Sequence, residues 1–455
     1  MAAAVPARLA EALSVCAVLV FGTAGPAHGQ VPASPAQTDP VLEALVEEAL
    51  ARNPDLPSAQ AGIDAARTAV ARARARPDPM VSLAFTNDGW APSLGRMPMT
   101  TLGIMVSQEL PWSGKRQLRA DVAASRARES EPALARARLT LEASVRRAYY
   151  ALVLARELHA LTADQRTLLQ QIEGVARARY AVGQGTQTDV LRAQTEVTRL
   201  EQRAVEQEAE ADVRQAEINR LVARPHDTAV ATIPRLAIVP MSGTEQDAVA
   251  EARAVSPELK AARLAVETNR AAAALARREL KPDLTVQGGF MNRGGLDPMW
   301  VAGVGVSWPF DKKARESAIA EAEILANGGA HGVESLGLQL DFRTRERFTR
   351  ARAAERLVAL YDGGVLPQDE MTVESALANY QAGKVPFTSV LESMAAFYAD
   401  RWARASLIAE HARLAASLRE ASLDADASMG QAAPPAAAAA SMGQTGAMAG
   451  GMGGK

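Results

Sequence analysis

Two spacings of hydrophobic residues alternate along this chain. Residues 42–50 place apolar side chains at three- and four-residue intervals, which is the period of an amphipathic helix. Residues 81–86 instead alternate apolar with small or polar side chains, which is the period of a strand. We therefore expect helices over about 40–76 and 245–281. Strands are predicted to follow each helical region, at Met80–Asn87, Thr100–Gln108, Leu284–Met291 and Trp300–Ser307.

The chain repeats itself at a distance of 200 residues. The segment from Tyr180 to Leu191 (YAVGQGTQTDVL) reappears from Tyr380 to Leu391 (YQAGKVPFTSVL), with five of twelve positions identical and no gap. Further landmarks recur in the same order, including an Asn/Ser-Pro-Asp/Glu-Leu sequence at 53–56 and 256–259. Internal duplication indicates two copies of one structural unit. We assign the first repeat to residues 30–225 and the second to 226–425.

Each repeat contains a long helical hairpin after its strands. Helical spacing extends over about 115–182 and 312–382, turns at Gly183 and Gly383, and returns over about 188–222 and 389–423. Pro132 predicts a kink in the first long helix. The Gly-rich stretch 326–338 predicts a break in the second. Near the start of each repeat, Pro54 and Pro257 predict helix–helix joints, with Asn53 and Ser256 as the N-caps of the helices that follow.

Composition and charge narrow the functional classes. The chain has 455 residues, a formal net charge of −2 and only 4% aromatic residues, which favours thin helix-on-helix packing and no nucleic-acid partner. Residues 1–29 resemble a secretory signal peptide, with Arg8 before an apolar run and small residues before Gln30. Cys16 falls inside that run, so we expect no disulfide and no thiol chemistry in the mature protein.

Residues 426–455 form a low-complexity tail rich in Met, Gly and Ala, which we expect to be disordered. Met429, Met442, Met448 and Met452 offer thioethers, which are ligands for soft metal ions. Their spacing is irregular and no His or Cys accompanies them, so an ordinary tail without metal is the competing interpretation.

Catalytic patterns are missing from the sequence. The five histidines are scattered, and no phosphate-binding loop or nucleophile elbow occurs. We expect no enzyme activity and no cofactor.

Four strands are too few to close on themselves, because a barrel needs about eight or more. Open strand edges cannot lie in lipid without hydrogen-bond partners. If these strands enter a membrane, further copies of the chain must complete the sheet, and three copies of four strands make twelve.

The duplicated plan, the segment Leu110-Pro-Trp-Ser-Gly-Lys-Arg116 and the two Tyr-x-x-Gly turns resemble the TolC-like outer membrane factor family, over about residues 38–423. The Pro-Trp-Ser-Gly-Lys-Arg form is similar to the branch that serves heavy-metal efflux. The resemblance implies a mainly α fold with a small membrane β-barrel, assembled as a homotrimeric duct. It further implies an outer-membrane location with a periplasmic helical tunnel, a membrane-fusion adaptor and an inner-membrane RND-type pump.

The resemblance also implies roles for the turns between the long helices. Val182, Gly183, Gln184, Ala382, Gly383 and Lys384 match the family's adaptor-contact turns. Ser389 and Glu392 match positions where family members carry an acidic ring that narrows the tunnel. The ordinary alternatives are that both glycines are helix C-caps and that Glu392 is a solvated surface carboxylate.

Two other functions remain open at this point. The chain could be a periplasmic coiled-coil adaptor or scaffold that never enters the membrane. It could also be the same duct serving drug or protein export, because a passive tunnel need not recognise its cargo.

Overall fold

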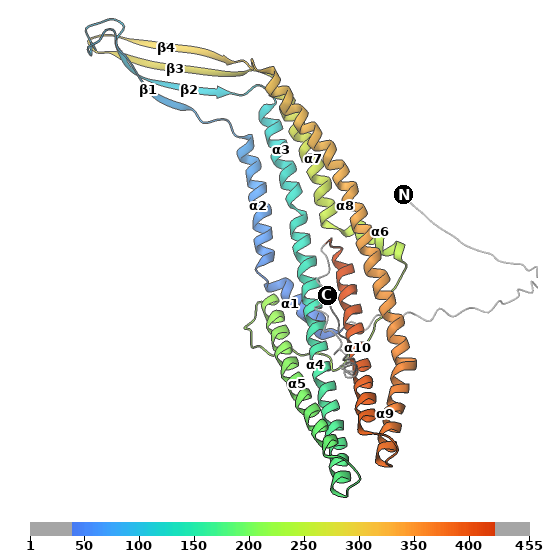
Figure 1. The fold of residues 1–455 in the computed structure, drawn as a ribbon. Coiled ribbons are helices and arrows are strands. Elements are labelled where there is room, and N and C mark those ends of the chain that lie inside the picture. The colour runs from blue at the N-terminus through green and yellow to red at the C-terminus, as the bar shows by residue number, and fades with distance from the viewer. Residues whose placement is uncertain (1–38, 424–455) are drawn as a thin grey trace, which may run out of the picture. The chain divides into compact units, whose positions relative to one another are not determined.

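The computed structural model describes residues 39–423 of the chain. The predicted signal peptide and the Met-rich tail lie outside these residues. Helices and strands follow one another in the same order twice (Figure 1). The first set comprises α1 (Pro40–Arg52), α2 (Asp55–Arg74), β1 (Met80–Thr86), β2 (Thr101–Leu110), α3 (Lys115–Ser130), α4 (Pro132–Ala181) and α5 (Gln187–Leu221). The second comprises α6 (Glu245–Val255), α7 (Pro257–Arg278), β3 (Asp283–Arg293), β4 (Leu296–Ser307), α8 (Lys312–Leu360), a π-helical turn (Tyr361–Val365), α9 (Leu366–Gln381) and α10 (Phe387–Glu420).

Side-chain caps define the helix starts near the two proline joints. Ser256 is the N-cap of α7, and its hydroxyl accepts a hydrogen bond from the Leu259 amide at 3.4 Å. The Asn53 carboxamide oxygen accepts from the Asp55 amide at 2.8 Å, and its amino group donates to the Leu221 carbonyl at 2.9 Å. Ser256 therefore caps α7 as predicted. Asn53 is instead the C-cap of α1, because Pro54 already has helical backbone angles and stands at the N-cap of α2, and the Asn53 side chain ties this joint to the end of α5.

The first long helical segment continues through its proline almost without interruption. Helix α3 ends at Ser130 and α4 begins at Pro132, with Glu131 between them in a right-handed helical conformation. Proline is tolerated at the first helical position because its missing N–H has no intrahelical partner there. Helix α4 alone has 50 residues, a length of about 75 Å.

The Gly-rich stretch does not break the second long helix, so that prediction was wrong. Helix α8 runs from Lys312 to Leu360 without interruption. A side chain on Gly329 would approach the Val266 methyl of α7 to 3.1 Å. The glycine therefore permits close contact between α7 and α8, and this packing offsets the roughly 1 kcal/mol by which glycine disfavours a helix.

The helical segment predicted over 312–382 is instead interrupted at Tyr361–Val365, by one π-helical turn. Pro367 follows this turn and has no amide hydrogen for the carbonyl of Gly363 four residues earlier, so the regular ladder cannot continue. An ion pair between Asp362 and Arg404 joins the turn to α10; the Nη2–Oδ2 distance is 3.3 Å. Sequence periodicity missed this feature because a π-turn inserts a residue without ending the helix.

The four strands form one antiparallel sheet in the order β1-β2-β3-β4. Met80 pairs with Ser107 across β1 and β2, and Leu102 pairs with Asn292 across β2 and β3. The two predicted hairpins are thus joined edge to edge by the β2–β3 pairing. Strands β1 and β4 are the open edges of this sheet.

Two large hydrophobic cores and a smaller cluster around Leu259 and Leu340 hold the described helices together. One large core joins α1, the start of α2, α4, the end of α5, the segment after it, and parts of α8 and α10. It includes Leu42, Tyr149, Leu152, Ile218, Val358 and Ile408. The other joins the ends of the α4–α5 and α9–α10 hairpins, including Leu169, Ile172, Ala193, Tyr380, Phe387 and Val390. Among the described helices, none has both the length and the apolar character needed to cross a bilayer.

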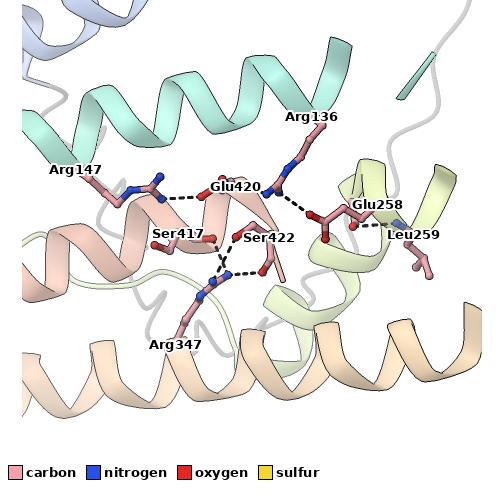
Figure 2. A network of polar contacts seen from close by, with 9 residues as sticks. Arg136, Arg147, Glu258, Leu259, Arg347, Ser417, Glu420 and Ser422 are labelled. Carbon is pink, nitrogen blue, oxygen red and sulfur yellow. Dashed lines mark hydrogen bonds and ion pairs between the residues drawn. The ribbon is translucent and has the colours of Figure 1, made fainter. Parts of the chain in front are cut away.

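A buried ionic network links four helices near the C-terminal end of α10 (Figure 2). Glu420 is only 3% exposed; it accepts a hydrogen bond from Arg147 of α4 at 2.7 Å and lies 3.8 Å from Arg136. Arg136 also pairs with Glu258 of α7 at 3.0 Å. On the other side of α10, Arg347 of α8 donates to main-chain carbonyls at the helix end, at 2.8 and 3.2 Å. Charged groups therefore accompany a small apolar cluster of Leu259, Leu340 and Ala421 where α10 ends.

A second polar contact fixes the segment between the repeats. Glu355 of α8 accepts hydrogen bonds from the Met241 amide at 2.6 Å and from Arg352 at 3.0 Å, and lies 3.2 Å from Nε2 of the buried His411. Burial alone would raise the pKa of Glu355, but these hydrogen bonds together hold it below its usual range. Burial lowers the pKa of His411, in spite of the nearby carboxylate.

Candidate functional site

The first interhelical turn is a glycine-terminated helix end. Gly183 has φ = 72° and donates its N–H to the Tyr180 carbonyl at 3.0 Å. The Gln184 amide reaches back to the Arg179 carbonyl at 2.9 Å. This pair of bonds is the Schellman arrangement, which needs a left-handed residue and therefore favours glycine. Thr186 then starts α5 with a capping box formed with Asp189.

The second turn has the same backbone geometry. Gly383 has φ = 74° and donates to the Tyr380 carbonyl at 3.0 Å, and the Lys384 amide donates to Asn379 at 2.8 Å. The C-cap interpretation of both glycines is therefore confirmed. All six predicted turn residues, Val182, Gly183, Gln184, Ala382, Gly383 and Lys384, are exposed to solvent.

Arg179 connects the two turns. Its Nη2 donates to the Gln184 carbonyl at 3.0 Å, and its guanidinium carbon lies 4.7 Å from the centre of the Tyr380 ring. A side chain on Gly383 would lie 3.4 Å from Nη2 of Arg179. Arg179 therefore contacts both interhelical turns, as well as Tyr380 near the end of α9.

Tyr380 is buried beneath this arginine and packs against Phe387, with ring centres 5.4 Å apart. Burial raises the pKa of its phenol, and the charge of Asp189 adds to the shift. A cation over an aromatic face is stabilised by about 0.5–2 kcal/mol, more when water is excluded. The sequence analysis missed Arg179, because its contact with Tyr380 spans 201 positions of the chain.

The two predicted gate residues lie just after the second turn. Ser389 is half-buried in the first turn of α10, and its amide donates to the Pro386 carbonyl at 3.2 Å. Glu392 is exposed, one helical turn further along. Ser389 and Glu392 therefore occupy the same end of the molecule as the two interhelical turns, and a gating role for them stays a prediction.

The sheet has two chemically different faces. On one face of the sheet, each of the four strands carries large apolar side chains that are exposed. These residues are Val81, Leu83, Phe85, Leu102, Ile104, Val106, Val286, Phe290, Trp300, Val304 and Val306. The opposite side carries mainly Gly, Ala, Ser, Thr and Met. Exposed apolar faces of this extent are rare on proteins surrounded by water.

The Pro-Trp-Ser-Gly-Lys-Arg segment joins the sheet to the helices. Lys115 is 2% exposed, and its ammonium group donates to Asp283 at 2.8 Å, while the same carboxylate accepts from the Trp112 amide at 2.7 Å. Gly114 has φ = 89°, and a side chain on it would lie 3.3 Å from Nε of Arg278. The segment thus fastens the exit of β2 to the entry of β3.

The described residues form no metal site from imidazole, thiolate or carboxylate ligands. Within residues 39–423, no group of three or more His, Cys, Asp or Glu side chains could hold a metal ion. The four predicted thioether ligands of the tail, Met429, Met442, Met448 and Met452, lie outside the described residues.

Comparison with known proteins agrees with this geometry. Residues 45–224 match the family described as outer membrane efflux protein. The matched segment runs from within α1 to just past the end of α5, and so lies in the first repeat. No curated protein sequence matches the chain.

Solved structures of membrane channels and outer membrane proteins extend the likeness over both repeats. The outer-membrane channel OprN superimposes with a TM-score of 0.70 at 21% identity, covering 84% of this chain and 90% of OprN. CusC gives a TM-score of 0.68 at 17% identity, with 85% and 91% covered. VceC of Vibrio cholerae gives 0.68 at 18%, with 84% and 95% covered. The fold is therefore that of the TolC-like outer membrane channels, as the sequence predicted.

Proposed function

We propose that this chain is the outer-membrane duct of a tripartite efflux system, through which substrates pass passively to the exterior. The observation that carries the proposal is the sheet, which combines one exposed apolar face with two open edges and continues directly into long helical hairpins. The match of residues 45–224 to the outer membrane efflux protein family and the structural likeness to outer-membrane channels support it.

The apolar face of the sheet fits contact with lipid. Strands β2, β3 and β4 have 10, 11 and 12 residues, close to the roughly 9–11 that a tilted strand needs to cross a bilayer. Exposed aromatic side chains flank the aliphatic residues: Trp90 and Trp300 toward the loops, and Trp112, Trp308 and Phe310 toward the helices. Aromatic side chains at both ends of an apolar band are typical of membrane strands.

The open edges require further copies of the chain. Unpaired N–H and C=O groups on β1 and β4 would cost several kcal/mol each in lipid. We propose a homotrimer in which β1 of one copy pairs with β4 of the next, so that three sheets close on one another. Exposed apolar side chains on the helices would be covered in the same assembly; they include Leu191 and Val205 of α5, Leu338 and Phe342 of α8, and Met371 of α9.

The two glycine turns are the proposed docking points for a periplasmic adaptor, which would join the duct to an inner-membrane pump. Their exposure and their rigid Schellman geometry support this role, because a preformed turn loses little entropy on binding. Glu392 and Ser389 are the proposed constriction. Heavy-metal ions are the proposed cargo, on the resemblance of the Pro-Trp-Ser-Gly-Lys-Arg segment to that branch.

Cross-linking of the strand edges tests the assembly. Ala84→Cys on β1 and Val301→Cys on β4 lie on the same face of the sheet, at opposite edges. Oxidation of the double variant in isolated outer membranes is expected to give covalent dimers and trimers, while either single variant stays monomeric on denaturing gels. Release of the chain by osmotic shock, with a monomeric mass in detergent, would instead identify a periplasmic scaffold.

A further inference from the structure

Methionine is distributed unevenly over the sheet. Strand residues Met80, Met105, Met291 and Met299 all lie on the face that carries small and hydroxyl side chains. The apolar face contains Val, Leu, Ile, Phe and Trp but no methionine. If methionine served only as a hydrophobic filler, it would be expected on the lipid side as readily as on this one.

Two of these thioethers lie over glycines of the neighbouring strand. Gly103 pairs with Met291, and Met105 pairs with Gly289. A side chain added to Gly103 would collide with the sulfur of Met291, and one added to Gly289 would collide with the sulfur of Met105. The two methionines therefore sit on adjacent steps of the same ladder, about 7 Å apart along the strands. Met299 faces Met291 from β4.

Uncharged side chains are the nearest strand neighbours of Met105 and Met291 on this face, and the first charged residues, Arg293 and Asp297, stand two positions from Met291 and Met299. On this face, β2 carries Thr, Gly, Met and Ser from position 101 to 107, and β3 carries Gln, Gly and Met from 287 to 291. A site with thioethers and no carboxylate, imidazole or thiolate disfavours hard divalent cations, which need oxygen ligands. It favours soft monovalent cations, which bind thioether sulfur without a compensating negative charge.

We propose that Met105 and Met291, with Met299 beside them, form a binding site for soft monovalent metal ions, Ag(I) or Cu(I), on the inner face of the sheet. The inference rests on the proposed duct, in which this face lines the passage and three copies repeat the site around it. Methionine is unbranched and has three rotatable bonds, so its sulfur can turn toward an ion that passes. A transit site must bind weakly enough to release its ion again.

Silver binding tests this site in the full-length protein. The tail also carries thioethers, so the reference protein has Met429, Met442, Met448 and Met452 replaced by Leu. Silver nitrate is titrated into this protein in detergent, and binding is followed by equilibrium dialysis and by the methyl signals of ¹³C-labelled methionine. We expect Met105→Leu with Met291→Leu to weaken binding by at least about tenfold. The matched control Met371→Leu removes an exposed helical methionine and is expected to leave binding unchanged.

The outcomes separate this inference from the proposed function. Equal silver binding by the reference protein and the double variant would overturn the site, as would binding no tighter than that of free methionine. Single-channel conductance in potassium chloride is measured on the same preparations. A protein that conducts ions but does not bind silver would refute the proposed metal site and leave the proposed duct standing. A protein that stays monomeric and does not conduct ions would refute the proposed duct as well. If the double variant does not assemble, Met105→Leu alone is tested, since leucine matches methionine in volume.

Discussion

Replacing Glu420 by Gln tests the energetic weight of the buried network. The substitution keeps the shape of the side chain but removes the charge that faces Arg147 and Arg136. Breaking a buried ion pair costs roughly 3–5 kcal/mol when the remaining charge is fully buried. Here the Arg147 and Arg136 side chains are 31% and 23% exposed, and Arg136 keeps its contact with Glu258. We therefore expect the free energy of unfolding to fall by about 2–3 kcal/mol.

A surface ion pair of similar geometry provides the control. Glu131 lies 2.9 Å from Arg67, with side chains 44% and 55% exposed. Glu131→Gln is expected to cost less than about 1 kcal/mol, because water screens and replaces the interaction. Both variants are unfolded with guanidinium in detergent and followed by circular dichroism. Equal midpoints for the two variants, with unchanged slopes, would refute the argument that burial gives the Glu420 pairs their strength.

Three further effects follow from the helix ends and the buried polar contacts. Gly383→Ala forces a side chain into the left-handed region and is expected to lower the free energy of unfolding by about 1 kcal/mol. The control Gly364→Ala changes a glycine at negative φ with open space around it, and should not lower this free energy. Both variants are compared by their guanidinium midpoints. Arg179→Ala should increase amide hydrogen exchange at both turns, and exchange unchanged at the second turn would show that the arginine does not join them. The pKa values of His411 and Glu355 are lower in the folded protein than their ordinary values, so the unfolded state binds more protons on acidification. The folded state therefore loses stability as the pH falls, starting below the ordinary histidine pKa of 6.5. His411→Gln should reduce this loss of stability between pH 7 and 5, and an unchanged pH profile of stability would contradict the argument.

The elements of the fold were predictable because their signals are local. Strand periodicity located all four strands to within a few residues, and the repeated Tyr-x-x-Gly motif located both turns. These features depend on the alternation of side chains along one segment and on the left-handed conformation of one glycine. The resemblance of the chain to outer membrane factors then followed from the order of local features.

Features that depend on a second segment could not be predicted. Gly329 looks like a helix breaker until Val266 of the neighbouring helix is placed beside it. Glu420 resembles any surface carboxylate at the end of an amphipathic helix, and only the folded chain brings Arg147 and Arg136 to it. The cation–π contact of Arg179 has the same origin. A single sequence contains the residues of such contacts but no signal that pairs them.

The two interhelical turns carry different side chains at the positions that precede their glycines. Arg179 of the first repeat corresponds to Asn379 of the second at the 200-residue spacing, while Tyr180 corresponds to Tyr380. Tyr380 is 3% exposed beneath the arginine, but Tyr180 is 48% exposed. In a ring of three copies, each turn would have one neighbour in its own chain and one in the next. The contact within the chain is built from Arg179 and the buried Tyr380, whereas the matching positions Asn379 and Tyr180 carry an asparagine and an exposed tyrosine. In the proposed trimer, a movement that separates neighbouring copies at this end would therefore leave the Arg179–Tyr380 contact intact, because both residues belong to the same chain.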